Sequence, residues 1–205
     1  MDIKKTANLL INFAIKRLAE IFGIIIFVAG LLLLLALLTY SPEDPNFIFP
    51  ENTEIKNILG FQGSFVSDLF FQSIGLVSYM FSFTLIITGI NIFRLKEFFI
   101  VIENIFFAII YSVFGTLFLA YYYFDAFNLY INGNGGFIGN YFNQTFLNSL
   151  ILYNEKLFYY VLIILILIIF LISINFHPKK FYLIIKKIIQ IFTKNEQKNY
   201  TSKSE

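Results

Sequence analysis

The chain lacks most of the residue types on which catalytic and metal sites are built. Its 205 residues include no cysteine, no tryptophan, one histidine and four prolines, and charged residues make up only 14%. The absence of cysteine excludes disulfides and thiolate metal sites. The one histidine, His177, cannot form a metal cluster alone, and we interpret it as a helix-end residue beside Pro178.

No catalytic constellation appears in the sequence either. There is no cluster of carboxylates, no paired histidine and no Ser/His/Asp set within an apolar stretch. No glycine run is followed by Gly-Lys-Ser or Gly-Lys-Thr, so these residues cannot hydrolyse nucleotide by the P-loop mechanism. We therefore predict no catalytic residue, no cofactor and no metal site, and we do not expect the chain to be an enzyme by itself.

Long apolar runs dominate what is present. Hydrophobic residues make up 58% of the chain, and the mean hydropathy is +0.75. A soluble domain of this length could not cover so much apolar surface, whereas in lipid no protein cover is needed. Four runs approach the roughly 20 helical residues that cross a hydrocarbon core of about 30 Å; they are residues 21–40, 76–93, 105–123 and 157–176. The first run is too long for a signal peptide and lacks a small-x-small cleavage pattern. The sequence therefore predicts an all-α polytopic membrane protein with four transmembrane helices.

The positive charges indicate how the chain is threaded. Thirteen of the fifteen Lys and Arg residues lie in the N-terminal segment, in the loop between the second and third runs, or in the C-terminal tail. Only Lys56 and Lys156 lie in the two long connections, residues 41–73 and 124–156. Because cationic loops stay in the cytoplasm, we expect both termini inside and both long connections outside. Tyrosines at the predicted outer helix ends favour the same orientation: Tyr40, Tyr121, Tyr122, Tyr123, Tyr159 and Tyr160.

These limits predict three parts of the chain. They are a cytoplasmic N-terminal segment (1–20), a four-helix transmembrane domain (21–176) and a basic C-terminal part (177–205). Residues 181–194 read FYLIIKKIIQIFTK, an apolar helical pattern that is interrupted by lysines and is short for a span. We expect a basic amphipathic helix on the anionic inner leaflet, with contact between its lysines and DNA as the less favoured alternative. The polar residues 195–205 are predicted to be disordered.

The two long connections share an internal repeat. Gly60-Phe61-Gln62-Gly63 recurs 76 residues later as Gly136-Phe137-Ile138-Gly139. In each copy the glycines open a short amphipathic stretch that leads into the next membrane helix. We therefore predict two tandem helix-loop-helix units, each running helix out, loop, glycine turn, short outer helix and helix in.

Glycines and small polar residues are the candidate structural sites. Glycine permits positive φ and close backbone approach, and we predict turn or packing roles for the outer glycines and one carboxylate: Gly60, Gly63, Asp68, Gly75, Gly135, Gly136 and Gly139. Asp68 is expected to be either solvated or bonded to a glycine turn. In the second run Ser78, Ser82 and Gly89 share roughly one helical face, which indicates a helix interface, with Gly115 of the third run as a candidate partner. We expect Glu103 to be an interfacial carboxylate paired with Lys96 or Arg94.

Three short motifs accompany the apolar runs in a fixed order. After the first run the chain reads Leu38-Thr39-Tyr40-Ser41-Pro42-Glu43-Asp44-Pro45-Asn46. Before the second it reads Asn57-Ile58-Leu59-Gly60-Phe61-Gln62-Gly63, then Ser67-Asp68-Leu69-Phe70-Phe71-Gln72 and Gly75, and before the last it reads Gly135-Gly136-Phe137-Ile138-Gly139. In order and topology these residues resemble the N-terminal four-helix membrane region of FtsK/SpoIIIE-type bacterial DNA translocases. The resemblance covers about residues 21–176.

The resemblance implies a membrane anchor and assembly domain. It implies a multi-pass protein of the bacterial cytoplasmic (inner) membrane at the division septum, which forms a homo-oligomer, contacts other division proteins and serves cell division and chromosome segregation. DNA would be reached only through the ATPase motor of the family, which is absent from these residues. The alternative is a small transporter or channel subunit, which the tandem repeat favours and the lack of charged residues within the apolar runs disfavours.

Overall fold

The computed structural model describes residues 3–45, 54–124 and 132–178, together with Lys186 and Gln190. The chain divides into two compact units, residues 1–174 and 175–205. Apart from Lys186 and Gln190, the amphipathic helix predicted at 181–194 lies outside the described residues, and so does the tail predicted to be disordered. All of the helices named below belong to the first unit.

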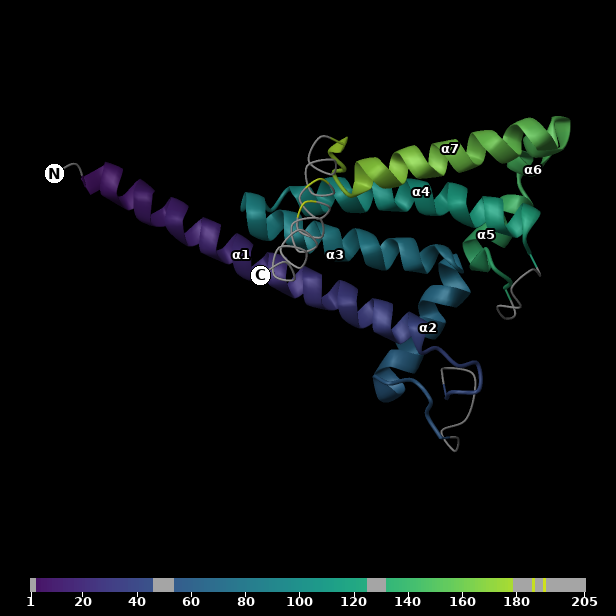
Figure 1. Cartoon of the computed structure of the whole chain (residues 1–205), viewed down its shortest axis with the longest axis horizontal. Helices are drawn as coiled ribbons and strands as arrows, with labels where there is room; N and C mark the ends of the chain where they lie inside the picture. Colours follow the sequence, from purple (N-terminus) through teal and green to yellow (C-terminus); the bar gives the residue numbers. More distant parts are fainter. Residues whose placement is uncertain (1–2, 46–53, 125–131, 179–185, 187–189, 191–205) are drawn as a thin grey trace, which may run out of the picture. The chain divides into compact units, whose positions relative to one another are not determined.

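In its described residues the first unit consists of seven helices and no strand (Figure 1). They are α1 (Ile3–Leu38), α2 (Gly60–Ile74), α3 (Val77–Leu95), α4 (Ile100–Tyr122), α5 (Gly136–Asn143), α6 (Phe146–Tyr153) and α7 (Glu155–Ser173). Four of them, α1 from Ala7 onward, α3, α4 and α7, are long and apolar enough to cross a membrane. The prediction of an all-α polytopic membrane protein with four spans is confirmed.

Three of the four spanning helices begin earlier than the apolar runs do. α1 begins at Ile3 rather than near residue 21, α4 at Ile100 rather than 105, and α7 at Glu155 rather than 157. Charged side chains near these ends lower the local hydropathy, but Lys, Arg and Glu are good helix formers. Charge therefore limited the predicted spans without ending the helices. At α7 the side chain of Asn154 also caps the helix, because its Oδ1 accepts the N–H of Leu157 at 3.2 Å.

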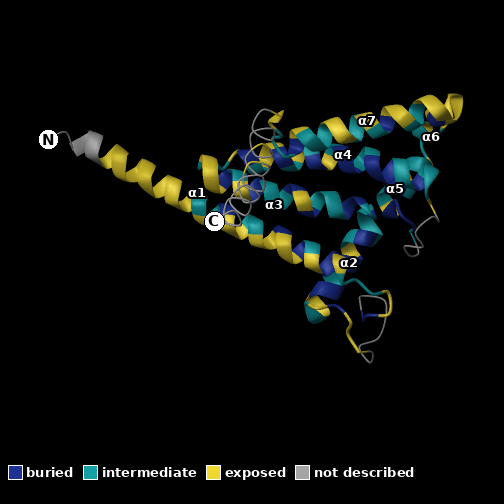
Figure 2. Cartoon of the chain, in the orientation of Figure 1, coloured by how far each residue is buried: buried dark blue, intermediate teal, exposed yellow. Residues whose placement is uncertain are grey.

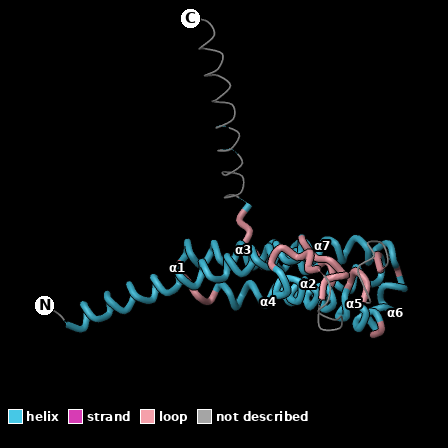
Figure 3. The backbone as a smooth tube through the Cα atoms, turned by 90° about the horizontal axis from the view of Figure 1, so that it is seen from below, coloured by secondary structure: helices cyan, strands magenta, loops and turns pink. Residues whose placement is uncertain are grey.

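The four spans lie in the order α1, α3, α4, α7. α1 packs on α3, α3 on α4, and α4 on α7 (Figure 1). Helix α2 connects α1 to α3, α5 and α6 connect α4 to α7, and α2 contacts α5. Figure 3, a view turned by 90°, shows α2, α5 and α6 at the same end of the spans. Buried residues concentrate on the two middle helices, α3 and α4, and are fewer on α1 and α7 (Figure 2).

The internal repeat is present in the backbone. Gly60 and Gly136 are the first residues of α2 and α5, and their φ angles are +65° and +64°. The N–H of Gly60 donates to Asn57 O at 2.9 Å, and that of Gly136 donates to Gly133 O at 3.2 Å, so each helix opens with the same turn. The halves differ afterwards, because α2 runs on to Ile74 whereas α5 ends at Asn143 and the chain restarts as α6.

Glycines bring the backbones of α1 and α3 into direct contact. A Cβ added to Gly23 of α1 would lie 2.7 Å from Phe93 N and 2.8 Å from Gly89 O on α3. A Cβ added to Gly89 would overlap the backbone of Phe27. Because lipid exerts no hydrophobic force between helices, such close approach, with its dispersion contacts, is what holds a helix pair together. Gly89 therefore does lie at a helix interface, but it faces α1, and it does not meet Gly115.

Alanine at Gly89 should separate α1 from α3, because its Cβ would meet backbone atoms rather than a movable side chain. Gly115→Ala is the matched control, since its Cβ would meet only the side chain of Val77, at 3.0 Å. We expect Gly89→Ala to lower the free energy of unfolding by about 2–3 kcal/mol and Gly115→Ala to change it by less than about 1 kcal/mol. The measurement is the midpoint of SDS-induced unfolding in mixed micelles, followed by circular dichroism. Equal midpoints for the two variants would contradict the close α1–α3 contact.

Candidate functional site: junctions between the helices

Titratable side chains do not gather into a reaction centre in the described part of the chain. No group of three or more His, Cys, Asp or Glu side chains there could hold a metal ion. The buried acids among the described residues are Asp44 and Asp68, and both lie outside the spans. The candidate site is instead a set of contacts that fix the helices to one another. We name them the glycine junction, the first-loop clamp and the polar network.

The glycine junction joins the two halves of the chain, backbone to backbone. It consists of Gly75, between α2 and α3, and residues 132–136, which precede and open α5. The N–H of Leu76 donates to Asn134 O at 3.0 Å. A Cβ on Gly75 would overlap Asn134 O, and one on Gly136 would lie 2.7 Å from Ser73 O. Gly75 and Gly136 also have positive φ angles, +58° and +64°. Both conformation and space therefore require glycine at these two positions.

Amide side chains hold the loop of the glycine junction in place. Asn134 is fully buried, and its Nδ2 donates to Tyr123 O, at the end of α4. The Nδ2 of Asn132 donates to Gln72 Oε1 at 3.0 Å, which ties the loop to α2. The Nδ2 of Asn140 donates to Asn132 O at 2.8 Å, which ties it to α5. The loop is thus bonded to three helices at once.

Two further glycines seat α5 on α4. A Cβ on Gly135 would lie 2.5 Å from Thr116 O and 2.8 Å from the Ala120 Cβ. A Cβ on Gly139, one helical turn later, would overlap the same Thr116 carbonyl. Both glycines are buried, so the backbone of α5 rests directly on a small-residue patch of α4. This contact fixes where the second connection crosses the bundle.

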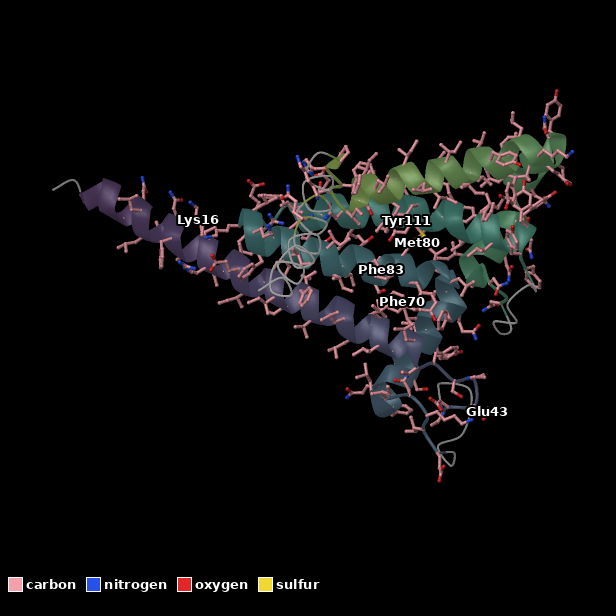
Figure 4. The ribbon with its side chains drawn as sticks, viewed as in Figure 1. Lys16, Glu43, Phe70, Met80, Phe83 and Tyr111 are labelled. Carbon is pink, nitrogen blue, oxygen red and sulfur yellow. The ribbon has the colours of Figure 1, made fainter. Side chains whose placement is uncertain are left out.

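The first-loop clamp closes the connection that follows α1. Asp44 is 1% exposed, and its carboxylate accepts the backbone N–H groups of Lys56 at 2.8 Å and Asn57 at 2.9 Å. The Nδ2 of Asn57 donates to Ala36 O at 2.9 Å, in the last turn of α1, where carbonyls lack helical partners. On the surface, Lys56 pairs with Glu43, and their hydrogen bond lowers the pKa of Glu43 and raises the pKa of Lys56. Figure 4 shows Glu43 in this connection.

Tyr40 and Asp68 extend the clamp to α2. Asp68 is buried rather than solvated, and its Oδ1 accepts the hydroxyl of Tyr40 at 2.8 Å. The Tyr40 ring packs on Phe71, with 4.7 Å between the ring centroids. The hydroxyl of Tyr79 on α3 donates to Leu37 O at 3.2 Å. The end of α1 is therefore bonded to both α2 and α3.

The polar network joins α3, α4 and α7 within the spans. Thr84 Oγ1 on α3 lies 2.9 Å from Tyr111 Oη on α4 and 3.3 Å from Ser173 Oγ on α7, and all three residues are buried. One turn along α3, Thr88 Oγ1 accepts the Nδ2 of Asn104 at 2.8 Å. Figure 4 shows Tyr111 on α4, among the side chains of the central helices. Because lipid offers no alternative partner, these pairs set the register of the three helices.

Sequence reasoning missed three members of the network, namely Asn104, Tyr111 and Ser173. Asn104 directly precedes the apolar run 105–123, and Tyr111 looks like the other aromatic residues inside it. The available signal was their spacing, since residues 104 and 111 are about two helical turns apart and so share a face.

Ion pairing at the α3–α4 turn differs from the expectation. Lys96 Nζ lies 2.8 Å from Glu20 Oε1, and Arg17 lies 2.5 Å from Glu20 Oε2. The expected pairing of Glu103 with Lys96 or Arg94 is not found among the ion pairs of the described residues, where Lys96 pairs with Glu20. The physical reason is that α1 continues past the turn and places Glu20 beside Lys96, whereas Glu103 is exposed on α4.

The predicted turn and packing residues fall into three places. Gly75, Gly135 and Gly136 meet in the glycine junction, with Gly139 beside them on α5. Gly60, Gly63 and Asp68 lie on α2, where Gly63 fits against Asn57. Ser78 and Ser82 are buried on α3, and their hydroxyls donate to the carbonyls of Gly75 at 2.6 Å and Tyr79 at 2.8 Å. The functional roles assigned to these residues stay predictions.

Alanine at Gly75 should disrupt the glycine junction. Gly60→Ala is the matched control, because Gly60 has the same kind of positive φ but nothing lies within 4 Å of an added Cβ. Gly60→Ala should lower the free energy of unfolding by about 1–2 kcal/mol, from backbone strain alone. Gly75→Ala adds the overlap with Asn134 O and should lower it by about 3 kcal/mol or more. SDS-induced unfolding measures both, and equal losses would refute a backbone contact at Gly75.

Removing the Tyr111 hydroxyl should weaken the contact of α4 with α3. We expect Tyr111→Phe to lower the free energy of unfolding by about 0.6 kcal/mol and by no more than about 1.7 kcal/mol. Tyr160→Phe, at a residue that is 66% exposed, is the control and should change little. In a double-mutant cycle, Thr84→Val and Tyr111→Phe should be less than additive. Full additivity would mean that the two hydroxyls do not interact.

Comparison with known proteins gives one consistent family. Residues 15–185 match the family described as the 4TM region of DNA translocase FtsK/SpoIIIE. DNA translocase FtsK of Rhizobium meliloti is 31% identical over 78 residues, which are 38% of this chain and 9% of that protein. DNA translocase FtsK of Caulobacter vibrioides is 35% identical over 73 residues, which are 36% of this chain and 9% of that protein. No solved structure matches the chain.

The two relatives are matched over a small part of their length, whereas the family match covers most of this chain. With four apolar helices inside the matched range, the chain is a multi-pass protein of the inner membrane. The resemblance that the sequence motifs indicated is confirmed, and the chain belongs to the family of the 4TM region of FtsK/SpoIIIE DNA translocases.

Proposed function

We propose that this chain is the membrane anchor and assembly domain of an FtsK-type DNA translocase, acting in cell division and chromosome segregation at the septum. The observation that carries the proposal is how the polar side chains within the spans are used. These side chains form hydrogen bonds between helices: Thr84 with Tyr111 and Ser173, and Thr88 with Asn104. They hold the helices together, which is what an anchor requires.

The same observation disfavours a transporter or channel subunit. Transport sites within a membrane use ionisable side chains or broken helices near the middle of the bilayer. Among the described residues, the buried acids Asp44 and Asp68 belong to the connections at one end of the spans. In the described residues, each of the four spans is one continuous helix. The 205 residues then act by holding and assembling, not by catalysis or transport.

A cytoplasmic location of both termini supports an anchor for a cytoplasmic motor. The Glu20–Lys96 pair places the first part of α1 beside the α3–α4 turn, and Asn91 Nδ2 donates to Ile174 O just beyond α7. Three segments therefore lie at one end of the spans: the cationic N-terminal segment, the turn with Arg94 and Lys96, and the end of α7. Under the positive-inside rule this end faces the cytoplasm. DNA would be reached only through a motor outside these residues.

The proposed partners are further copies of this chain, other division proteins and lipid. α1 and α7 expose long apolar faces, including Ile24, Ile25, Ile164 and Ile168. In a membrane such faces meet either lipid or another helix. An oligomer of this domain would agree with the homo-oligomer that the family resemblance implies.

Threading can be tested with reporter fusions. Alkaline phosphatase inserted in either long connection, after Glu54 or after Gln144, should be active because the enzyme folds only outside the cytoplasm. Green fluorescent protein at either terminus should fluoresce, because it folds inside. An active phosphatase at a terminus would overturn the proposed orientation.

Septal function has its own test in the native cell. A fluorescent fusion of the full chain should gather at midcell, and depletion of the protein should yield filaments. The Gly75→Ala variant should lose the midcell signal and Gly60→Ala should keep it, if both are present at equal levels in the membrane. Uniform membrane label with normal division would overturn the proposal, and ion flux through reconstituted vesicles would favour a channel instead.

A further inference from the structure

Helix α1 is longer than a membrane requires. Its 36 residues measure about 54 Å at 1.5 Å per residue, whereas the hydrocarbon core is about 30 Å thick. The Glu20–Lys96 pair marks where the other spans end, because Lys96 directly follows the last residue of α3. From Glu20 to Leu38 the helix measures about 28 Å, which by itself fills the core. Residues 3–18 therefore extend past the α3–α4 turn, whereas Ala19 is buried against Ile92 and Ile100.

Side chains on this extension are exposed although many are apolar. Every residue from 7 to 18 is exposed, as the N-terminal part of α1 shows in Figure 2. The large apolar side chains have exposed fractions between 46% and 66%: Leu9, Leu10, Ile11, Phe13, Ile15 and Leu18. A contiguous apolar set of this size on a helix indicates contact with another surface.

The extension is amphipathic. Apolar residues recur at the i, i+3, i+4, i+7 spacing of one helical face. We call this face the apolar stripe; it consists of Ala7, Leu10, Ile11, Ala14, Ile15 and Leu18. Asn12 and Lys16 lie on the side away from the stripe, which also carries Leu9, and Asn8 lies on the flank of the stripe. Phe13 lies outside the stripe, where the guanidinium of Arg17 covers it, with Cζ 5.0 Å from the ring centroid.

The charges indicate which surface the stripe meets. Up to Glu20, α1 contains four cations, Lys4, Lys5, Lys16 and Arg17, and Glu20 is already paired with Arg17 and Lys96. A parallel second copy would bring these cations together and be repelled. Anionic lipid would attract them, by about 1 kcal/mol for each cation near the surface. Lys16 projects from the part of α1 that lies beyond the other spans (Figure 4).

We propose that residues 7–18 of α1 lie in the interface of an anionic membrane. The apolar stripe enters the boundary between headgroups and acyl chains, and Lys16 and Arg17 contact lipid phosphates. Tilting of α1 brings residues 7–18 closer to the membrane surface. This contact does not depend on the septal function.

The lack of cysteine makes the proposal directly testable, because a single introduced cysteine can be spin labelled in the full chain. The chain is reconstituted in phosphatidylcholine vesicles with and without phosphatidylglycerol. Ile11→Cys probes the stripe and Asn12→Cys the side away from it. Ile25→Cys, at a residue that is 58% exposed within the span, is the lipid reference, and Glu54→Cys is the aqueous reference. With phosphatidylglycerol, the accessibility to oxygen relative to a water-soluble nickel complex should be several-fold higher at 11 than at 12.

Two results would overturn the interfacial location. A label at position 11 as open to nickel as the one at 54 would mean that the helix projects into water. A label at 11 shielded from both reagents would mean that protein, such as a second copy, covers the stripe. The role of charge has a separate control: Lys16→Gln should shrink the difference between 11 and 12, whereas Lys16→Arg should keep it. A difference that is insensitive both to phosphatidylglycerol and to Lys16→Gln would overturn the contact with anionic lipid.

Discussion

Hydrocarbon accepts no hydrogen bonds, and this constraint shapes the polar network and the ends of the spans. Within a helix the peptide groups bond to one another. Polar groups lack a partner only where a helix ends or where a polar side chain enters the span. At those points the chain supplies its own partners: Asn57 bonds to the last turn of α1, and Asn134 bonds to the end of α4. The glycine junction does the same with backbone alone, through Leu76 and Asn134. The residues that matter are therefore amides, hydroxyls and glycines, together with the carboxylates of Asp44 and Asp68 in the first connection.

The fold class could be predicted from the sequence because apolar run length is set directly by bilayer thickness. The ends of the helices could not be predicted, because a charged residue near the membrane surface lowers the local hydropathy without breaking the helix. Lys16, Arg17 and Glu103 all lie within helices. The glycine turns were predictable from the repeat, because positive φ is a local requirement. The contacts of each glycine could not be predicted. Gly89 contacts α1 and Gly75 contacts Asn134 because of the order in which the helices pack, and that order is a property of the whole fold. The polar network also depends on which helices are neighbours, and the residue pattern of one helix does not contain that information.

Family membership and physical role agree at the level of single residues. The motif after the first span contains Tyr40 and Asp44, and the motif before the second contains Asn57 and Asp68. In the structure Asp44 holds the backbone at Asn57, and Asp68 accepts the hydroxyl of Tyr40. Several of the residues that carry the resemblance thus also close the first connection. Their chemistry is that of a scaffold, which fits a domain whose proposed work is to hold other parts in place.

The order α1, α3, α4, α7 has a geometric consequence for any larger assembly. In the described residues the four spans form a single row, with α1 and α7 at its two edges. A helix added beside either edge would continue the row, whereas one added over α3 and α4 would start a second layer.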